Sequence, residues 1–281
     1  MHPLLEKYTV LLADRSGVEA ISREMEKQTA DIFQTRENQK SQIEKIAASI
    51  RSLPNVLLLG MGASHFVNEV FALQLRTIGK SALAMTASEF LYDPIPLKNT
   101  TVILTSQSGE SVETVKCLSL LSAHLLFGVT LILESTIARK TNALICAGGT
   151  EKAYAGTRSV TLSLAAFAFV AEELGIVNAE AIEQAVRFEP SELMLLDHAI
   201  WLLFNKSTII SSGRSLFAPI ANLFALGCEE LGNRAVLSNE GGTFRHGPME
   251  IMNPDTVLVL FRQAGTLGEL NRSFADLRKQ S

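Results

Sequence analysis

Short apolar runs alternate with amphipathic stretches along most of this chain, and this alternation restricts the possible fold more than any other feature. Five runs have the length of a strand and no polar face, as expected for strands buried on both sides: 56–61, 82–87, 101–106, 129–134 and 143–148. Between them, residues 65–79 and 113–126 repeat apolar side chains every three to four positions, which is typical of helices. The alternation predicts a parallel sheet with right-handed crossovers and helices on both faces.

The pattern extends on both sides of this region. Two helices are expected before the first strand, at 17–29 and 35–52, and further helices from about 158 to 204. The alternation then restarts, with expected strands at 208–214, 235–240 and 256–261 and a helix near 216–231. The restart predicts a second lobe of the same class, with a boundary between residues 190 and 205.

We therefore assign residues 1–195 to the N-terminal helices and the first lobe, and residues 196–281 to the second lobe. Both lobes are expected to be doubly wound, flavodoxin-like α/β units. The second lobe shows about three strands and closes on an expected helix, 268–281, with no strand after it. We expect this lobe to be incomplete at its C-terminus.

Composition narrows the class of protein. A net charge of −4 without a basic run argues against nucleic acid as a partner. The start of the chain lacks the pattern of a signal peptide, and Ser122, His124 and Thr130 interrupt the longest apolar region, so we expect a cytoplasmic protein without a membrane span. The three cysteines lie far apart in apolar settings and are expected to be buried, reduced thiols rather than metal ligands.

Two loops follow expected strands at the sheet edge where parallel folds bind ligands. The first is G-M-G-A-S at 60–64. It matches the dinucleotide motif G-x-G-x-x-G poorly because His65 takes the place of the third glycine, and no P-loop lysine is present. A dehydrogenase is therefore disfavoured, and no cofactor is expected.

The second loop, S-Q-S-G-E-S at 106–111, gathers hydroxyl and amide donors at the start of a helix. Neutral donors at a positive helix end suit a phosphate dianion, and Gly109 would allow close approach of the backbone. The predicted phosphate ligands are Ser106, Gln107, Ser108 and Ser111. The alternative is that Ser108 only caps the helix and the other groups are solvated.

A third candidate region, 228–251, holds carboxylates and a histidine on a glycine-rich loop. Glu230, at the end of a helix, and His246 could form an acid/base pair, with Glu229 and Glu240 as other carboxylates. Alternatively, the glutamates mark a surface helix end and His246 caps the next helix.

Together these segments resemble the sugar isomerase (SIS) domain family. The resemblance is strongest to the isomerase half of glucosamine-6-phosphate synthase and to free-standing amino-sugar-phosphate deaminases and deglycases. It rests on segments spread over most of the chain: Glu24-Met25-x-x-Gln28, G-M-G-A-S at 60–64, S-Q-S-G-E-S at 106–111, E-K-A-Y-A-G-T-R-S-V-T at 151–161, G-R-S at 213–215 and F-R-H-G-P at 244–248.

The resemblance implies a role for each matching position. The serines of 106–111 and Gln107 would hold a sugar phosphate, and Gly62, Ala63 and Ser64 would contact the sugar. Glu230 matches the family's base, which moves a proton between C1 and C2 through an enediol or enolamine. His246 matches a histidine that assists ring opening from a neighbouring subunit. A homodimer is therefore expected.

Three departures from the family pattern bear on the activity. There is no room for the glutamine-cleaving domain of the synthase, so glutamine-dependent synthesis is not expected. Gly227 stands where the synthase has a lysine one turn before the base. The lysine-bearing tail that follows in the family has no counterpart after Ser281.

The sequence thus predicts an enzyme of amino-sugar phosphates, an aldose–ketose isomerase or deaminase acting on a glucosamine-6-phosphate-like substrate. A fructosamine-6-phosphate-type deglycase and a sensing module that binds sugar phosphate without turnover remain as alternatives. The glutamate at 230 and the absence of a basic N-terminal domain favour the enzyme.

Overall fold

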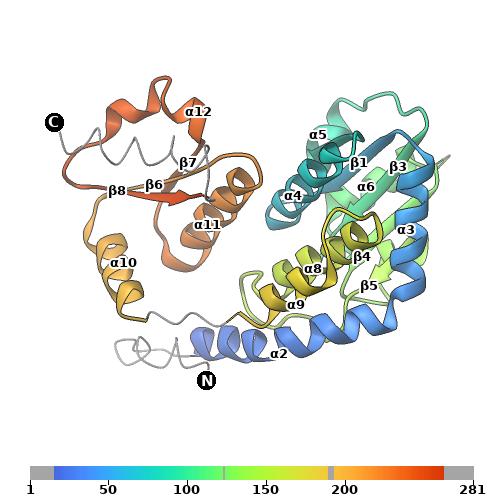
Figure 1. The fold of residues 1–281 in the computed structure, drawn as a ribbon, viewed down its shortest axis with the longest axis horizontal. Helices are drawn as coiled ribbons and strands as arrows, with labels where there is room; N and C mark the ends of the chain where they lie inside the picture. Colours follow the sequence, from blue (N-terminus) through green and yellow to red (C-terminus); the bar gives the residue numbers. More distant parts are fainter. Residues whose placement is uncertain (1–15, 123, 189–192, 263–281) are drawn as a thin grey trace. The chain divides into compact units, whose positions relative to one another are not determined.

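The computed structural model describes residues 16–122, 124–188 and 193–262 and divides the chain into two compact units, Met1–Glu189 and Pro190–Ser281 (Figure 1). Each unit contains its own parallel sheet. The strand order is β2-β1-β3-β4-β5 in the first unit and β7-β6-β8 in the second. The predicted fold class, α/β with two parallel sheets of which the second is smaller, is confirmed.

All five predicted strands of the first unit are present. They are β1 (Asn55–Gly60), β2 (Ser81–Thr86), β3 (Thr100–Thr105), β4 (Leu126–Thr130) and β5 (Asn142–Ile145). The predicted fourth strand, 129–134, began three residues and ended four residues too late. Leu126 was assigned to the preceding helix, which ends at Leu120. The run stays apolar after Thr130 because Leu131 is buried in a turn, where its N–H is bonded to the carbonyl of Gln107.

The helices of the first unit are α2 (Ser16–Asn38), α3 (Lys40–Ser52), α4 (Ala63–Thr77), α5 (Ala87–Tyr92), α6 (Val112–Leu120), α7 (Thr136–Lys140), α8 (Arg158–Glu173) and α9 (Ala179–Val186). The predicted break between residues 29 and 35 was wrong, since α2 continues to Asn38. That stretch has no glycine or proline, and Asp31, Ile32 and Thr35 face the interior of the unit.

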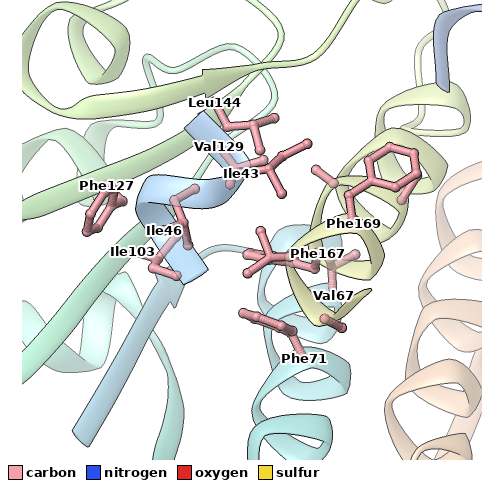
Figure 2. Close-up of a cluster of buried hydrophobic side chains, with 14 of the residues drawn as sticks. Ile43, Ile46, Val67, Phe71, Ile103, Phe127, Val129, Leu144, Phe167 and Phe169 are labelled. Atoms are coloured by element: carbon pink, nitrogen blue, oxygen red, sulfur yellow. The ribbon is translucent and has the colours of Figure 1, made fainter. Parts of the chain in front are cut away.

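Side chains of the sheet alternate between two cores, so the first unit has three layers. Leu58, Ile103 and Val129 face one core, together with side chains from α3, α4 and α8 (Figure 2). Phe71 of α4 stacks on Phe167 of α8 there, with ring centroids 4.5 Å apart. On the opposite face, the other side chains of the same strands pack against α5, α6 and α7. Central strands buried on both faces explain why their sequences carry no polar alternation.

The second unit consists of α10 (Leu193–Asn205), β6 (Thr208–Gly213), α11 (Phe217–Gly232), β7 (Val236–Glu240), α12 (Gly241–Phe244), a 3₁₀ turn η1 (Pro248–Ile251) and β8 (Thr256–Phe261). Its core is small and centres on Ile209, Ala225 and Val236. The predicted helix at 268–281 lies outside the described residues.

Two further properties concern the described part of the chain. None of its helices combines the length and apolarity needed to cross a bilayer. The cysteines are unpaired, and Cys117 and Cys146 are buried, as predicted, whereas the prediction that Cys228 is buried was wrong because it is partly exposed. Burial raises the pKa of Cys146 to about 12 and that of Cys117 to about 11, so both thiols are protonated at neutral pH.

Candidate functional site

The carboxyl ends of β1 and β3 lie side by side, with Gly60 opposite Thr105 in the register. Because β2 pairs with the other edge of β1, the strand order reverses between β1 and β3. Open parallel sheets bind ligands beyond the strand ends at such a reversal. The predicted ligand-binding residues of the first unit all follow these two strands: Gly62, Ala63, Ser64, Ser106, Gln107, Ser108 and Ser111.

The loop after β3 uses its own hydroxyl groups to form a tight turn. The Ser106 side chain, in a residue only 2% exposed, accepts a hydrogen bond from the N–H of Gly109 at 3.1 Å. The Ser108 hydroxyl accepts from the N–H of Glu110 at 3.2 Å. In both bonds the hydroxyl oxygen is the acceptor, so neither bond uses the O–H proton.

Glycine is required in this turn. Gly109 has a φ of +64°, and a Cβ atom there would lie 2.1 Å from Oγ of Ser135. The turn is also held from outside, since the Gln107 carbonyl accepts from the N–H of Leu131 and, at 3.1 Å, from the hydroxyl of Thr130. The loop is therefore a built structure rather than a solvated connection.

The N-terminus of α6 lies directly after this turn and has no side-chain cap. Ser111 is its N-cap residue, yet its hydroxyl makes no capping hydrogen bond. Ser108 bonds to Glu110 instead of to the helix, so the alternative that Ser108 only caps α6 is wrong. The one carboxylate of the turn, on Glu110, accepts from the N–H of Thr136 at 2.6 Å, and this bond lowers the pKa of Glu110. No side-chain cap thus accepts from the first N–H groups of α6, although Glu113 lies in its first turn.

The N-terminus of α8, in contrast, is occupied by the carboxylate of Glu151. Its Oε1 accepts from the N–H of Thr157 at 2.8 Å, the hydroxyl of Thr157 at 2.7 Å and the N–H of Arg158 at 2.7 Å. Its Oε2 accepts from the N–H of Ser159 at 3.2 Å and from the hydroxyl of Ser159. A glutamate before the helix therefore takes the place that an external anion could fill.

The loop after β1 approaches the loop after β3 through a buried amide. Asn68 of α4 is fully buried, and its Oδ1 accepts from the hydroxyl of Thr105 at 2.7 Å. Its Nδ2 lies under Gly60, where an added Cβ would come within 3.0 Å of that nitrogen. Gly62, with φ +51°, then begins α4 and leads into Ser64. Helix α4 is thereby joined to both strand ends.

A cavity of about 200 Å³ opens between these loops and the start of α8. Three predicted site residues line it, namely Ala63, Ser64 and Gln107, whereas Gly62, Ser106, Ser108 and Ser111 are outside its lining. The remaining lining residues are Met61, Val67, Glu151, Ala153, Tyr154, Gly156, Ser159, Val160 and Ser163.

The sequence reading missed the second wall of this cavity. Residues 151–161 were noted only as a segment of the resemblance, with no role assigned. The sequence does contain a sign of this wall. Glu151 is an acidic residue shortly before Thr-Arg-Ser at the start of a helix, and an acidic residue in such a place is typical of helix capping. Tyr154 is 91% exposed at this wall.

Glu230 and His246 both belong to the second unit. Glu230 lies in the last turn of α11 and His246 in the turn that follows α12, and both side chains are exposed. His246 donates its backbone N–H to the carbonyl of Thr243. The 3₁₀ turn η1 that follows has no side-chain cap, so the alternative that His246 caps it is wrong. Their roles in catalysis stay predictions.

Glu240 is distinguished from Glu230 by its surroundings. Its carboxylate accepts from the N–H of Thr243 at 2.9 Å and so caps α12. Burial opposes ionisation of Glu240, but the N–H groups of Gly242 and Thr243 and the charge of Arg214 outweigh it and lower its pKa. A carboxylate held ionised by fixed donors is a weaker proton acceptor than one in water.

Comparison with known families agrees with this geometry. Residues 49–172, which contain β1 to β5, both ligand loops and most of α8, match the model of the SIS domain. Residues 49–172 are therefore similar to a SIS domain. A curated relative, the isomerizing glutamine–fructose-6-phosphate aminotransferase of Sulfurisphaera tokodaii, is 29% identical over 235 residues, or 81% of this chain. The alignment covers 40% of that relative, so the chain spans well under half of its length.

Solved structures share the fold over most of the chain. The tagatose-6-phosphate ketose/aldose isomerase of Escherichia coli superposes with a TM-score of 0.79 at 19% identity, covering 93% of this chain and 78% of that one. The glucosamine-6-phosphate deaminase of Thermotoga maritima gives a TM-score of 0.70 at 20% identity, covering 90% and 82%. At these identities the likeness concerns the fold.

Proposed function

We propose that this chain is a cytoplasmic phosphosugar-processing enzyme that binds an amino-sugar phosphate and moves a proton between C1 and C2 of the sugar. The observation that carries the proposal is the turn after β3. Its Ser106 and Ser108 hydroxyls accept bonds from the backbone that leave their protons unused, and no side chain caps the helix that follows. Neutral donors at a helix N-terminus favour a phosphate dianion.

The sugar would extend from this phosphate into the cavity lined by Ser64 and Gln107. Glu230 would act as the base. In the open-chain form of glucosamine 6-phosphate it removes the proton at C2, the resulting enolamine is protonated at C1, and the iminium formed at C2 reacts with water. The products are fructose 6-phosphate and ammonia. A positioned carboxylate suits this transfer.

His246 would assist opening of the sugar ring, and we propose that it acts on the site of a neighbouring copy in a homodimer. The relatives support a sugar-phosphate substrate by their names, which include an aminotransferase acting on fructose 6-phosphate, a ketose/aldose isomerase and a deaminase. A plain isomerase, a deglycase and a non-catalytic sensor are the other outcomes of the test below.

The test is to incubate the protein with glucosamine 6-phosphate and to follow ammonia and fructose 6-phosphate together. Glu230→Gln should leave substrate binding unchanged and lower turnover by roughly 10²–10⁴-fold. Glu229→Gln, an exposed neighbour on the same helix, is the matched control and should keep its activity. Full turnover in Glu230→Gln would refute the assignment of the base.

The phosphate assignment has its own variant. Ser106→Ala combined with Ser108→Ala should weaken binding of glucosamine 6-phosphate, because two of the four predicted phosphate ligands lose their hydroxyl groups. Ser119→Ala removes a hydroxyl that donates to the Lys116 carbonyl on the other end of α6 and serves as the control. Unchanged affinity in the double variant would exclude this loop as the phosphate site.

A further inference from the structure

The first unit contains a fully buried arginine that the proposed reaction does not use. Arg158, at the start of α8, has no exposed surface. Its Nε donates to Glu24 at 2.6 Å and its Nη1 to Asp31 at 2.8 Å, and both carboxylates belong to α2, more than a hundred residues away in the sequence. Two buried carboxylates therefore share one guanidinium group.

Ion pairing alone does not explain this arrangement. Removing charges from water costs several kcal/mol per ion, and apolar side chains of similar volume often stabilise a core equally well. A second salt bridge joins the same two helices, α2 and α8, without full burial of its charges. Nη2 of Arg36 donates to both carboxylate oxygens of Glu172, at 2.6 and 2.8 Å, and both side chains stay partly exposed.

What separates Arg158 from Arg36 is contact with the loop that precedes α8. Nη1 of Arg158 also donates to the carbonyl of Ala147 at 3.2 Å, and Nη2 donates to the carbonyl of Gly149 at 3.0 Å. Between them Gly148, with φ +85°, packs so closely that a Cβ atom would lie 2.1 Å from Oδ2 of Asp31. The guanidinium group thus fixes the first half of this loop.

The second half of the loop is held by the same residues. Glu24 uses its other oxygen to accept from the backbone N–H of Lys152 at 3.2 Å. The backbone N–H of Arg158 donates to Glu151. Residues 147–158 are consequently anchored at both ends and near the middle, and the part between the anchors carries Tyr154 and Gly156, which line the cavity.

We propose that Arg158, Glu24 and Asp31 are positioning residues that set the wall of the cavity against which the sugar, rather than the phosphate, is placed. This inference rests on the proposed function, because it assigns the sugar to that cavity. The phosphate loop at 106–111 receives no hydrogen bond from these three side chains in the described structure, and its turn is held by Gly109, Thr130 and Leu131. The two halves of the substrate would therefore depend on separate sets of residues.

The separation can be measured with two probes on the full chain. Calorimetry would give the Kd of inorganic phosphate and of glucosamine 6-phosphate for the wild type, Arg158→Lys and Glu24→Gln. A lysine keeps the charge but cannot reach two carboxylates and two carbonyls at once. We expect the Kd of glucosamine 6-phosphate to rise at least about tenfold, as for a displaced binding group, with the Kd of inorganic phosphate within about twofold.

Arg36→Met is the matched control, because it breaks an ion pair between the same helices away from the loop. Arg36→Met should lower Tm and change neither Kd. If the role of Arg158 were purely structural, Arg158→Lys would likewise lower Tm and change neither Kd. Glu24→Gln is nearly isosteric and provides a second variant should Arg158→Lys not fold. An unchanged sugar-phosphate Kd in a folded variant, or an equal rise in both Kd values, would overturn the inference. Failure of the wild type to bind glucosamine 6-phosphate would overturn the proposed function and this inference with it.

Discussion

Two helices of the first unit, α6 and α8, have N-termini that are completed differently. At α8 the carboxylate of Glu151 accepts from three backbone N–H groups and two hydroxyls. At α6 the N-cap residue Ser111 makes no side-chain bond, and the nearby Glu110 is bonded to the start of α7. The same helix end can serve structure when the chain supplies the anion, and ligand binding when it does not.

The largest effect is expected from a substitution in the turn that precedes α6. Gly109→Ala places a Cβ atom where Ser135 already lies and forces an L-residue to φ +64°. The turn must shift, so the affinity for phosphate should fall by roughly a hundredfold. Stability should also fall by about 1–3 kcal/mol, measured by urea unfolding.

Gly79→Ala is a control that separates the backbone strain of a positive φ from the steric clash of an added Cβ atom. Gly79 has a similar φ of +79°, but nothing lies within 4 Å of an added Cβ atom. This variant should lose some stability and keep its affinity for phosphate. If Gly109→Ala also kept its affinity, the turn would not be the phosphate site.

A smaller effect is expected on the α8 side. Glu151→Ala removes the internal anion and should lower the free energy of unfolding by about 1–2 kcal/mol, as for the loss of a strong helix cap. Because the N–H groups of α8 then become free, inorganic phosphate should raise the Tm of this variant more than that of the wild type.

Asn178→Ala is the control for the loss of a cap, since Asn178 caps α9 through the N–H of Ala181 at 2.7 Å. It should lose comparable stability without a larger response to phosphate. If phosphate raised the Tm of Glu151→Ala and of the wild type equally, the N-terminus of α8 would not bind phosphate in place of the Glu151 carboxylate.

Acid should give the smallest effect, and it acts on the α8 side through Glu24. Burial tends to raise the pKa of Glu24, but the hydrogen bonds from Arg158 and Lys152 and the charges of Arg158 and Lys27 hold it below its ordinary value. Stability from this group is therefore complete above the unfolded pKa of about 4.3 and is lost as pH falls through the lower folded value.

Unfolding of the wild type and Glu24→Gln between pH 7 and pH 3 tests this sign. The wild type should be more stable by a constant amount down to about pH 4.5, and the difference should shrink below it. A difference that persists unchanged to pH 3 would mean that the pKa of Glu24 is not lowered in the folded protein.

Local pattern was sufficient to predict the strands and the loop at 106–111. The central strands, to which Leu57 and Val102 belong, are buried on both faces of the sheet, so an unbroken apolar run is a reliable sign of a central strand. The turn was predictable because the hydroxyls of Ser106 and Ser108 accept from backbone N–H groups that lie within three residues of them.

The other wall of the cavity could not be predicted in this way. Arg158 bonds to Glu24 and Asp31, 134 and 127 residues away, and no local pattern reports such a pairing. The fourth strand was misplaced for a related reason, since whether Leu126 ends a helix or begins a strand depends on its pairing with Val102. Register and long-range charge pairs are properties of the folded unit rather than of a sequence window.

The most direct test of this account is a titration with inorganic phosphate followed by the backbone amide signals of the full chain in NMR. The account predicts shifts at the β3–α6 turn and the first turn of α6, residues 106–114, with signals at the start of α8, residues 157–161, unchanged. Shifts at 157–161 without shifts at 106–114 would contradict it.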